Sequence, residues 1–167
     1  SLDADFLGSG PGHVRYARDF AKRRRVADPK KGITAHGAMN RLYVAEPIPS
    51  VTGGAADHRL PLTASAIEDL ARAIADAVRG QGSVPESLKA HSEWIQAVAE
   101  DLRAHAGTSI VIPGAYQSPA VHVLAHAINH ALGNVGKTVI HTAPVDAEPT
   151  LHVNGLKALM EELEAGD

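Results

Sequence analysis

The sequence predicts an α/β fold with a mostly parallel sheet that helices cover on both faces, in three layers. Two observations lead to this prediction. Short apolar segments alternate with segments whose apolar residues recur at helical spacing, in the order β-α-β-α-α-β-α-β-α, which is typical of parallel strands joined by crossover helices. Aromatic residues make up only 4% of the chain, so Val, Ile, Leu and Ala must build the core, which suits helices packed closely on a sheet.

The first strand and helix lie on either side of a glycine-rich turn. Residues 1–7 form the expected strand, and residues 8–12 form the turn. A helix follows from about residue 13 to residue 25, because apolar residues recur on one of its faces. These residues are Val14, Ala17 and Ala21. A basic loop covers residues 22–37, and the next strand is residues 41–46, which end at a proline.

Two helices are expected in the middle of the chain. The first begins at Ser65, because Ser65 and Glu68 have the spacing of a capping box, in which two side chains satisfy free amides at the start of a helix. Its apolar residues then recur at helical spacing to about residue 79. These residues are Ile67, Leu70, Ala71, Ile74 and Val78. The second helix is capped by Ser92 and runs to about residue 107.

The remaining elements are two strands and two helices. Residues 108–112 form a short apolar strand. A helix begins at Ser118-Pro119, the favoured cap and first-turn proline. Its apolar stripe consists of Val121, Leu124, Ala125, Ile128 and Leu132. Residues 137–142 form the last strand, and Asn154 caps the last helix, whose inward face is apolar. That face consists of Leu156, Leu159, Met160 and Leu163.

A parallel sheet of this kind gives a Rossmann-like domain, in which ligands bind where loops leave the carboxyl ends of the strands. The loops expected at that edge are residues 8–12, 47–57, 113–118 and 142–149. Residues 1–167 suit one domain. We expect it to be a fragment of a larger protein, because the chain begins inside a strand and stops at the end of a helix.

Composition narrows the classes of function. Residues 1–45 carry nine Lys/Arg and four Asp/Glu, whereas residues 46–167 carry seven and fifteen, and neither half specifies a partner. No apolar run approaches the ~20 residues that cross a bilayer, so we expect a soluble fragment with no direct membrane insertion. The sequence has no Cys, which excludes disulfides, a thiolate nucleophile and Cys-ligated iron–sulfur clusters from these 167 residues.

The glycine-rich loop is the first candidate site. Gly8, Gly10 and Gly12 could present backbone amides to a phosphate at the start of a helix, near Arg15 and Arg18. The spacing departs from G-x-G-x-x-G, because Gly12 comes one residue early, and no Lys-Ser/Thr follows as in a Walker loop. A plain tight turn is therefore the favoured interpretation, with phosphate binding as its alternative.

Histidines and serines offer further candidates. His122, His126 and His130 recur every four residues, the spacing with which imidazoles on one helical face share a zinc ion. They lie beside the apolar stripe and lack the Glu of an H-E-x-x-H pair, so we expect no metal site. No G-x-S-x-G occurs, and Ser118 is expected to cap a helix, so we expect no catalytic residue in this segment.

The basic run at residues 22–25, together with Lys30 and Lys31, could contact nucleic acid or anionic lipid. It lacks interleaved aromatic residues, and the net charge of the whole chain is -3. Cations also suit the carboxyl end of a helix. We therefore expect a solvated helix end and no nucleic-acid partner.

Residues 42–62 resemble the strand and loop signature of the molybdopterin oxidoreductase superfamily. That signature has a strand, an acid followed by Pro-Arg, a Thr-Ala/Gly loop, an Ala-Asp, a short apolar stretch and then Arg-Pro-Gly-Thr-Asp. The matching positions are Glu46-Pro47, Thr52-Gly53, Ala56-Asp57 and Leu60-Pro61-Leu62. Residues 132–136, Leu-Gly-Asn-Val-Gly, are likewise similar to the Leu-x-Gly-Asn-x-Gly that ends a helix in this family.

Within the superfamily, the chain looks most like the molybdopterin-like large subunit of alternative complex III, a membrane-bound assembly that oxidises quinol and passes electrons to periplasmic carriers. The similar positions are residues 39–44, residues 56–60, and Gly8, Pro11, His13, Tyr16, Arg18 and Phe20. The resemblance implies a parent subunit at the periplasmic face of the membrane, with iron–sulfur clusters in another domain and no pterin. Its partners would be other domains of the same subunit and other subunits of the redox complex.

Two departures from the superfamily pattern support the loss of the pterin. Ile48 stands where cofactor binders place Arg, and residues 62–66 stand where they place Arg-Pro-Gly-Thr-Asp. Each lost charge-assisted bond from Arg to the pyrophosphate removes about 1.5 to 3 kcal/mol. The resemblance thus implies a structural domain that is not catalytic by itself and holds no cofactor.

Two alternatives stay open. The first is the cofactor-binding domain of an active molybdenum oxidoreductase, in which a molybdopterin guanine dinucleotide would contact six residues once other domains close over it. These residues are Gly8, Gly10, Gly12, Glu46, Thr52 and Asp57. The second alternative is a free-standing nucleotide-binding module.

Overall fold

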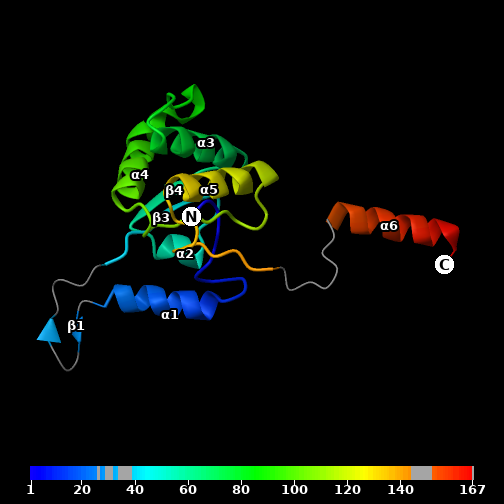
Figure 1. Ribbon diagram of the computed structural model, residues 1–167, viewed down its shortest axis with the longest axis horizontal. Helices are drawn as coiled ribbons and strands as arrows, with labels where there is room; N and C mark the ends of the chain where they lie inside the picture. Colours follow the sequence, from blue (N-terminus) through cyan, green and yellow to red (C-terminus); the bar gives the residue numbers. More distant parts are fainter. Residues whose placement is uncertain (26, 29–31, 34–38, 144–151, 167) are drawn as a thin grey trace.

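The computed structural model describes residues 1–25, 27–28, 32–33, 39–143 and 152–166. In this part of the chain the fold is mixed α and β, rich in helix, with a small parallel sheet (Figure 1). This combination of elements agrees with the α/β class that the sequence predicts.

The parallel sheet pairs β3 (Tyr43–Glu46) with β4 (His58–Pro61). β3 is the strand expected at residues 41–46. The sequence predicts a loop at residues 47–57 and no strand before the next helix, and this order of elements is wrong, because β4 follows the loop. Only Leu60 of the four β4 residues is buried, so the apolar alternation is too short to mark a strand. The strand ends in a proline, which an edge strand tolerates.

Leu2 extends the sheet on the other side of β3. It forms isolated parallel bridges to Ala45 of β3 and to Pro113, and its N–H donates to the Ile112 carbonyl at 2.8 Å. Across the sheet the segments therefore lie in the order Pro113, Leu2, β3, β4. The two strands expected around Leu2 and Pro113 are wrong in length, because each is reduced to a single bridge.

Three helices pack on one face of this sheet. α3 (Ile67–Val78) contacts both α4 (Ser92–Ala104) and α5 (Pro119–Ala131), as Figure 1 shows. The short 3-10 turns η1 (Ala64–Ala66) and η2 (Glu86–His91) precede α3 and α4. Most apolar residues predicted to face inward from α3 and α5 are buried against the sheet. The buried ones are Ile67, Leu70, Ala71, Ile74, Val121, Ala125, Ile128 and Leu132.

At Val111, whose backbone groups point away from Leu2, a side chain of α5 takes the place of a neighbouring strand. The Asn129 amide donates to the Val111 carbonyl at 2.8 Å, and its oxygen accepts from the Val111 N–H at 2.9 Å. Asn129 is buried, so these bonds satisfy polar groups that water cannot reach. A buried Asn inside an apolar helix stripe thus replaces strand pairing at this position.

The caps predicted at Ser65 and Ser92 are wrong, whereas Ser118 and Pro119 do occupy the N-cap and first-turn positions of α5 as expected. Ser65 lies inside η1, and Ser92 is the first residue of α4 rather than its cap. Ser118 does precede α5, but its hydroxyl donates to the Glu68 carboxylate at 2.9 Å. The same carboxylate accepts from Arg72 at 2.6 Å. Glu68 is engaged with these donors, and α3 begins without the reciprocal bond of a capping box.

The opposite face of the sheet packs against α1 (His13–Arg23) and α2 (Val51–Gly54) (Figure 1). Val44 and Ala45 are neighbours in β3, so their side chains point to opposite faces. Ala45 joins the cluster of α3 and α5, whereas Val44 joins a second, smaller cluster. Its members are Leu7, Leu42 and Val44, with Phe6, Ala17, Phe20, Ala55 and Ala56 packed against them.

The inward face predicted for α1 is wrong in part. Ala17 is half-buried as expected, but Val14 is 72% exposed and Ala21 is exposed. Phe20 and Arg24 complete the inward side instead. The spacing of apolar residues identifies the inward side of α1 poorly, because this helix buries none of its residues fully and contacts the sheet through a narrow strip.

The predicted basic loop contains a short antiparallel pair, β1 (Ala27–Asp28) and β2 (Gly32–Ile33). Lys30 and Lys31 lie outside the described residues. The strand expected at residues 137–142 is wrong, because Val139 forms only an isolated bridge to nearby Val135. An apolar run of this length does not distinguish a strand from an exposed connection.

α6 (His152–Ala165) is the last helix. Asn154 lies inside it and is not its cap. The apolar residues predicted to face inward are exposed in the structure. Helical spacing identifies the apolar side of a helix, but it does not show which part of the protein packs against that side. Their exposed fractions are 60% for Leu156, 51% for Leu159, 54% for Met160 and 67% for Leu163. Among the residues described here, no helix has the length and apolar character to cross a membrane.

Candidate functional site

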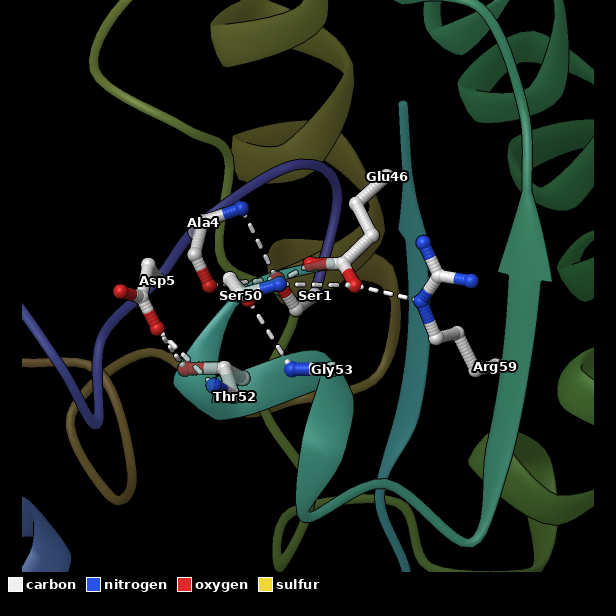
Figure 2. Close-up of polar contacts among 8 residues, drawn as sticks. All are labelled: Ser1, Ala4, Asp5, Glu46, Ser50, Thr52, Gly53 and Arg59. Atoms are coloured by element: carbon white, nitrogen blue, oxygen red, sulfur yellow. Dashed lines mark hydrogen bonds and ion pairs between the residues drawn. The ribbon is translucent and has the colours of Figure 1, made fainter. Parts of the chain in front are cut away.

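A cluster of polar side chains lies where the chain leaves the carboxyl ends of the Leu2 segment and β3. The bend after Leu2 and the one-turn helix α2 approach each other there. Figure 2 shows Asp5 and Thr52 pointing toward each other, and the Glu46 carboxylate pointing toward Ser50 and Arg59 of β4. This edge is where open parallel sheets bind ligands. Glu46 and Thr52, two of the six residues predicted to contact a cofactor, belong to this cluster.

Glu46 is the most buried charged residue of the cluster, with an exposed fraction of 2%. Its Oε1 accepts from Arg59 Nε at 2.6 Å and from the Ser50 N–H at 3.2 Å, and its Oε2 accepts from the Ser50 hydroxyl at 2.6 Å. Burial by itself raises the pKa of Glu46. The hydrogen bonds from Arg59 and Ser50 together outweigh burial and hold the pKa below its ordinary value.

α2 is built around this carboxylate. Ser50 caps the helix, because its hydroxyl oxygen accepts from the Gly53 N–H at 3.0 Å while its proton goes to Glu46. A Cβ on Gly53 would overlap the Glu46 carboxylate, so only glycine allows the helix to approach so closely. The Thr52-Gly53 match to the superfamily signature therefore has a packing reason in this chain.

Thr52 is fully buried and holds the bend after Leu2 against α2. Its hydroxyl donates to Asp5 Oδ1 at 2.8 Å, its N–H donates to the same oxygen at 2.9 Å, and its Oγ1 accepts from the Leu7 N–H at 3.0 Å. Burial raises the pKa of Asp5, but the bonds from Thr52 outweigh it and lower the pKa. Asp5 is a residue that the sequence analysis missed.

Asp57 lies at the other end of the sheet. Its N–H donates to the Leu42 carbonyl at 3.0 Å, just before β3 begins, so it is remote from Glu46 at the end of that strand. Arg24 forms a two-armed ion pair with the Asp57 carboxylate, which also accepts from the Leu42 N–H at 2.8 Å. Burial raises the pKa of Asp57, and these bonds, chiefly from Arg24, lower it below its ordinary value.

The three glycines of the candidate phosphate loop have conformational roles. A Cβ on Gly8 would overlap the Asp5 carboxylate and lie 2.9 Å from the Cβ of Val51. Gly10 and Gly12 have φ values of 82° and 84°, in the left-handed region that favours glycine. Gly12 is also the residue before α1. These positions fit the tight turn that the sequence analysis favours.

The histidines of α5 do not gather into a metal site. His126 and His130 are exposed and His122 is half-buried. The His126 ring lies 5.3 Å from the ring of His141, a contact between α5 and the following connection that the sequence did not indicate. Within the described residues, no group of three His, Asp or Glu side chains is arranged to hold a metal ion.

A second polar junction lies where the order of the segments across the sheet reverses, between Leu2 and Pro113. Asp3 has a φ of 59°, which is uncommon for a residue with a side chain. The Ser1 hydroxyl donates to the Ala4 carbonyl at 2.9 Å and accepts from the Ala4 N–H at 3.0 Å, which closes the bend around it. Gln117 Nε2 donates to the Asp3 carboxylate at 2.8 Å. The sequence analysis also missed this residue pair.

The candidate cofactor residues do not fit a pyrophosphate. Glu46 and Asp57 are carboxylates at opposite ends of the sheet, and both repel a phosphate. The two nearby guanidinium groups, Arg59 and Arg24, are already paired with them. None of the six residues lines the groove of about 830 Å³ or the smaller one of about 270 Å³ beside α3 and α4. The charges here are balanced within the chain.

Comparison with known proteins adds no relative: the chain matches no protein-family model and has no significant similarity to any characterised protein. The resemblance to the molybdopterin oxidoreductase superfamily therefore stays a prediction from the residues quoted above.

Proposed function

We propose that residues 1–167 form a structural domain of a molybdopterin-oxidoreductase-like subunit in a membrane-associated electron-transfer complex, and that the domain holds no pterin. In this proposal the parent subunit works at the periplasmic face of the membrane and carries any iron–sulfur clusters in another domain. The proposal depends mainly on Glu46, whose buried carboxylate already accepts hydrogen bonds from Arg59 and Ser50 within the chain.

The polar residues at the signature positions act on the fold. Glu46 ties β3 to β4 and to α2, Thr52 ties α2 to the bend at Asp5, and Asp57 ties β4 to the end of α1 through Arg24. Removing one partner of a buried ion pair costs about 3–5 kcal/mol. A cofactor that recruited Arg59 would therefore have to offset a loss of this kind at Glu46, and Ile48 supplies no replacement cation.

The finer fold assignment, a three-layer Rossmann-like domain, belongs to the same proposal. Two findings support it. The order Pro113, Leu2, β3, β4 has the fourth segment of the chain beside the first, as at the switch point of a doubly wound sheet. Apolar clusters on the two faces of β3 bring α3 and α5 to one side and α1 to the other.

The partners that follow from this proposal are the other domains of the subunit and the other subunits of the redox complex. In this role the domain contributes packing surfaces, since the sequence contains no Cys to ligate a cluster. The exposed apolar residues of α6 are candidates for such contacts.

Calorimetry with guanosine diphosphate, the nucleotide part of the alternative cofactor, tests the proposal on residues 1–167. We expect no saturable heat at millimolar nucleotide. Saturable heat that disappears in Thr52→Val and Asp57→Asn would contradict the proposal and favour the cofactor-binding domain of an active molybdenum oxidoreductase. Heat that survives both substitutions would also contradict it and favour the free-standing nucleotide-binding module.

A further inference from the structure

The groove of about 830 Å³ begins at Ser1 and Leu2 and lies on the line of the Leu2 segment. At Leu2 the chain is flanked on both sides, by Ala45 and by Pro113, through parallel bridges. Neighbouring strands lie about 4.8 Å apart, so the two flanking segments are about twice that distance apart. The groove walls continue these flanks toward the start of each segment, along residues 41–43 and 108–112.

Backbone groups of both flanks point into this groove. Alternate residues of a parallel strand direct both N–H and C=O to the same neighbour. The Tyr43 carbonyl accepts from the Ser1 nitrogen at 2.7 Å, so the Tyr43 N–H points to the position before Ser1. The Ile112 carbonyl accepts from Leu2, and the Ile112 N–H on the same side makes no hydrogen bond to any residue that the structure describes.

The groove is apolar above and below the plane of the sheet. Ile74, Trp94 and Val98 line it from α3 and α4, and Phe6 and Phe20 line it from the face that carries α1. A strand inside a parallel sheet is apolar on both faces, so the walls have the character that a central strand needs. Charged residues of the lining, such as Asp101, are fewer than the apolar ones.

Trp94 adds an independent observation. Its indole Nε1 is buried and has no hydrogen-bond partner among the described residues. The Trp94 ring packs edge-on against Tyr43, with ring centroids 5.8 Å apart, and both residues line the groove. The ring faces of Trp94 and Tyr43 give the groove an aromatic wall, against which an apolar side chain of an added strand would pack.

We propose that the groove takes a β-strand that runs parallel to β3 and continues in line from Ser1, formed by about four residues of polypeptide directly before it. Apolar side chains of this strand alternate between Trp94 on one face and Phe20 on the other. The register places the last residue of the strand next to the Ser1 nitrogen. A strand that is covalently joined to Ser1 therefore loses little translational entropy when it enters the groove, whereas a separate peptide loses much more on binding. This inference does not rest on the redox assignment.

Three proteins test it: residues 1–167, the same chain preceded by Val-Thr-Val-Ile, and a matched control preceded by Gly-Ser-Gly-Ser. Hydrogen exchange is measured at the Tyr43 and Ile112 amides. Trp94 is the only Trp of the chain, so its fluorescence reports the groove without labelling. We expect the Val-Thr-Val-Ile extension to slow both exchange rates by about 10-fold or more and to shift the emission to shorter wavelength, with little effect from Gly-Ser-Gly-Ser.

Two results would overturn the proposal. One is exchange and emission that are the same in all three proteins. The other is protection of both amides by the free acetylated Val-Thr-Val-Ile amide at micromolar concentration while the joined extension gives none, since this would assign the groove to a separate polypeptide. Binding of guanosine diphosphate in the calorimetric test would contradict the proposed function, but it would not change the exchange rates or the Trp94 emission measured here. The two proposals can therefore fail independently of each other.

Discussion

Arg59 of β4 and Glu46 of β3 form an ion pair across two neighbouring parallel strands, with Arg59 Nε 2.6 Å from Glu46 Oε1. The Glu46 side chain is 3% exposed and the Arg59 side chain is 28% exposed. A carboxylate with so little access to water depends on its partners. The pair therefore ties β3 to β4, and it occupies a position at which the cofactor-binding alternative expects a contact.

Replacing Arg59 with Met should leave the Glu46 carboxylate buried with only Ser50 as its partner. We expect Arg59→Met to lower the free energy of unfolding by about 3 kcal/mol, the lower end of the range for breaking buried pairs, because the guanidinium is partly exposed. Urea denaturation measures the loss. The double variant with Glu46→Gln should recover most of it, and a double variant no more stable than Arg59→Met would argue against the pair.

Adjacent glycines of α2 give a matched comparison. Gly53→Ala places a methyl group into the Glu46 carboxylate, whereas a Cβ on Gly54 meets nothing within 4 Å. We expect Gly53→Ala to destabilise the protein by about 1–3 kcal/mol, as overpacking does, and Gly54→Ala to be neutral or stabilising by up to about 1 kcal/mol. Thermal unfolding distinguishes the two. Equal melting temperatures would show that α2 does not press on Glu46.

Acid should weaken the fold through the carboxylates whose pKa is lowered, namely Asp5, Glu46 and Asp57. In the unfolded chain such groups have pKa values of about 3.9 to 4.3, so as pH falls the unfolded state takes up protons first. Stability is then fully present above about pH 5 and declines below about pH 4, toward the lower pKa values of the folded state.

The urea midpoint measured from pH 7 to pH 3 checks this dependence. Glu46→Gln combined with Asp57→Asn should flatten the decline, because two of the three groups then no longer titrate. A decline of unchanged steepness in that double variant would mean that other groups govern acid unfolding.

Arg24 should hold α1 on the sheet, since this helix buries none of its residues fully. We expect Arg24→Met to speed hydrogen exchange of the α1 amides by about 10-fold while the core of α3 exchanges as before. Arg18→Met is the control, because Arg18 is 64% exposed and pairs only with neighbouring Asp19 among the described residues. Equal exchange rates of the α1 amides in both variants would show that the ion pair of Arg24 and Asp57 does not hold α1 on the sheet.

The sequence predicts the central helices well and the sheet poorly, for a physical reason. Ile67, Leu70 and Ile74 recur at helical spacing in a helix of about three turns, so the pattern in α3 is long enough to identify both the helix and its buried face. β4 has four residues and one buried side chain, and Leu2 pairs only through isolated bridges. Strands this short leave little periodicity to detect.

The site was predictable in its positions but not in its pairings. The resemblance to the superfamily signature points to Glu46 and Thr52, yet their partners Arg59 and Asp5 lie 13 and 47 residues away along the chain. A carboxylate in a loop motif looks the same whether it faces a ligand or an internal arginine. Asp57 shows the same limit, because only the sheet register reveals that it lies at the opposite end from Glu46.

Mass spectrometry of the gently purified parent subunit under native conditions tests whether the subunit carries a pterin. We expect a subunit mass without a molybdopterin guanine dinucleotide and no pterin released on denaturation. A stoichiometric pterin dinucleotide, retained in the wild type and lost in Thr52→Val, would contradict this expectation.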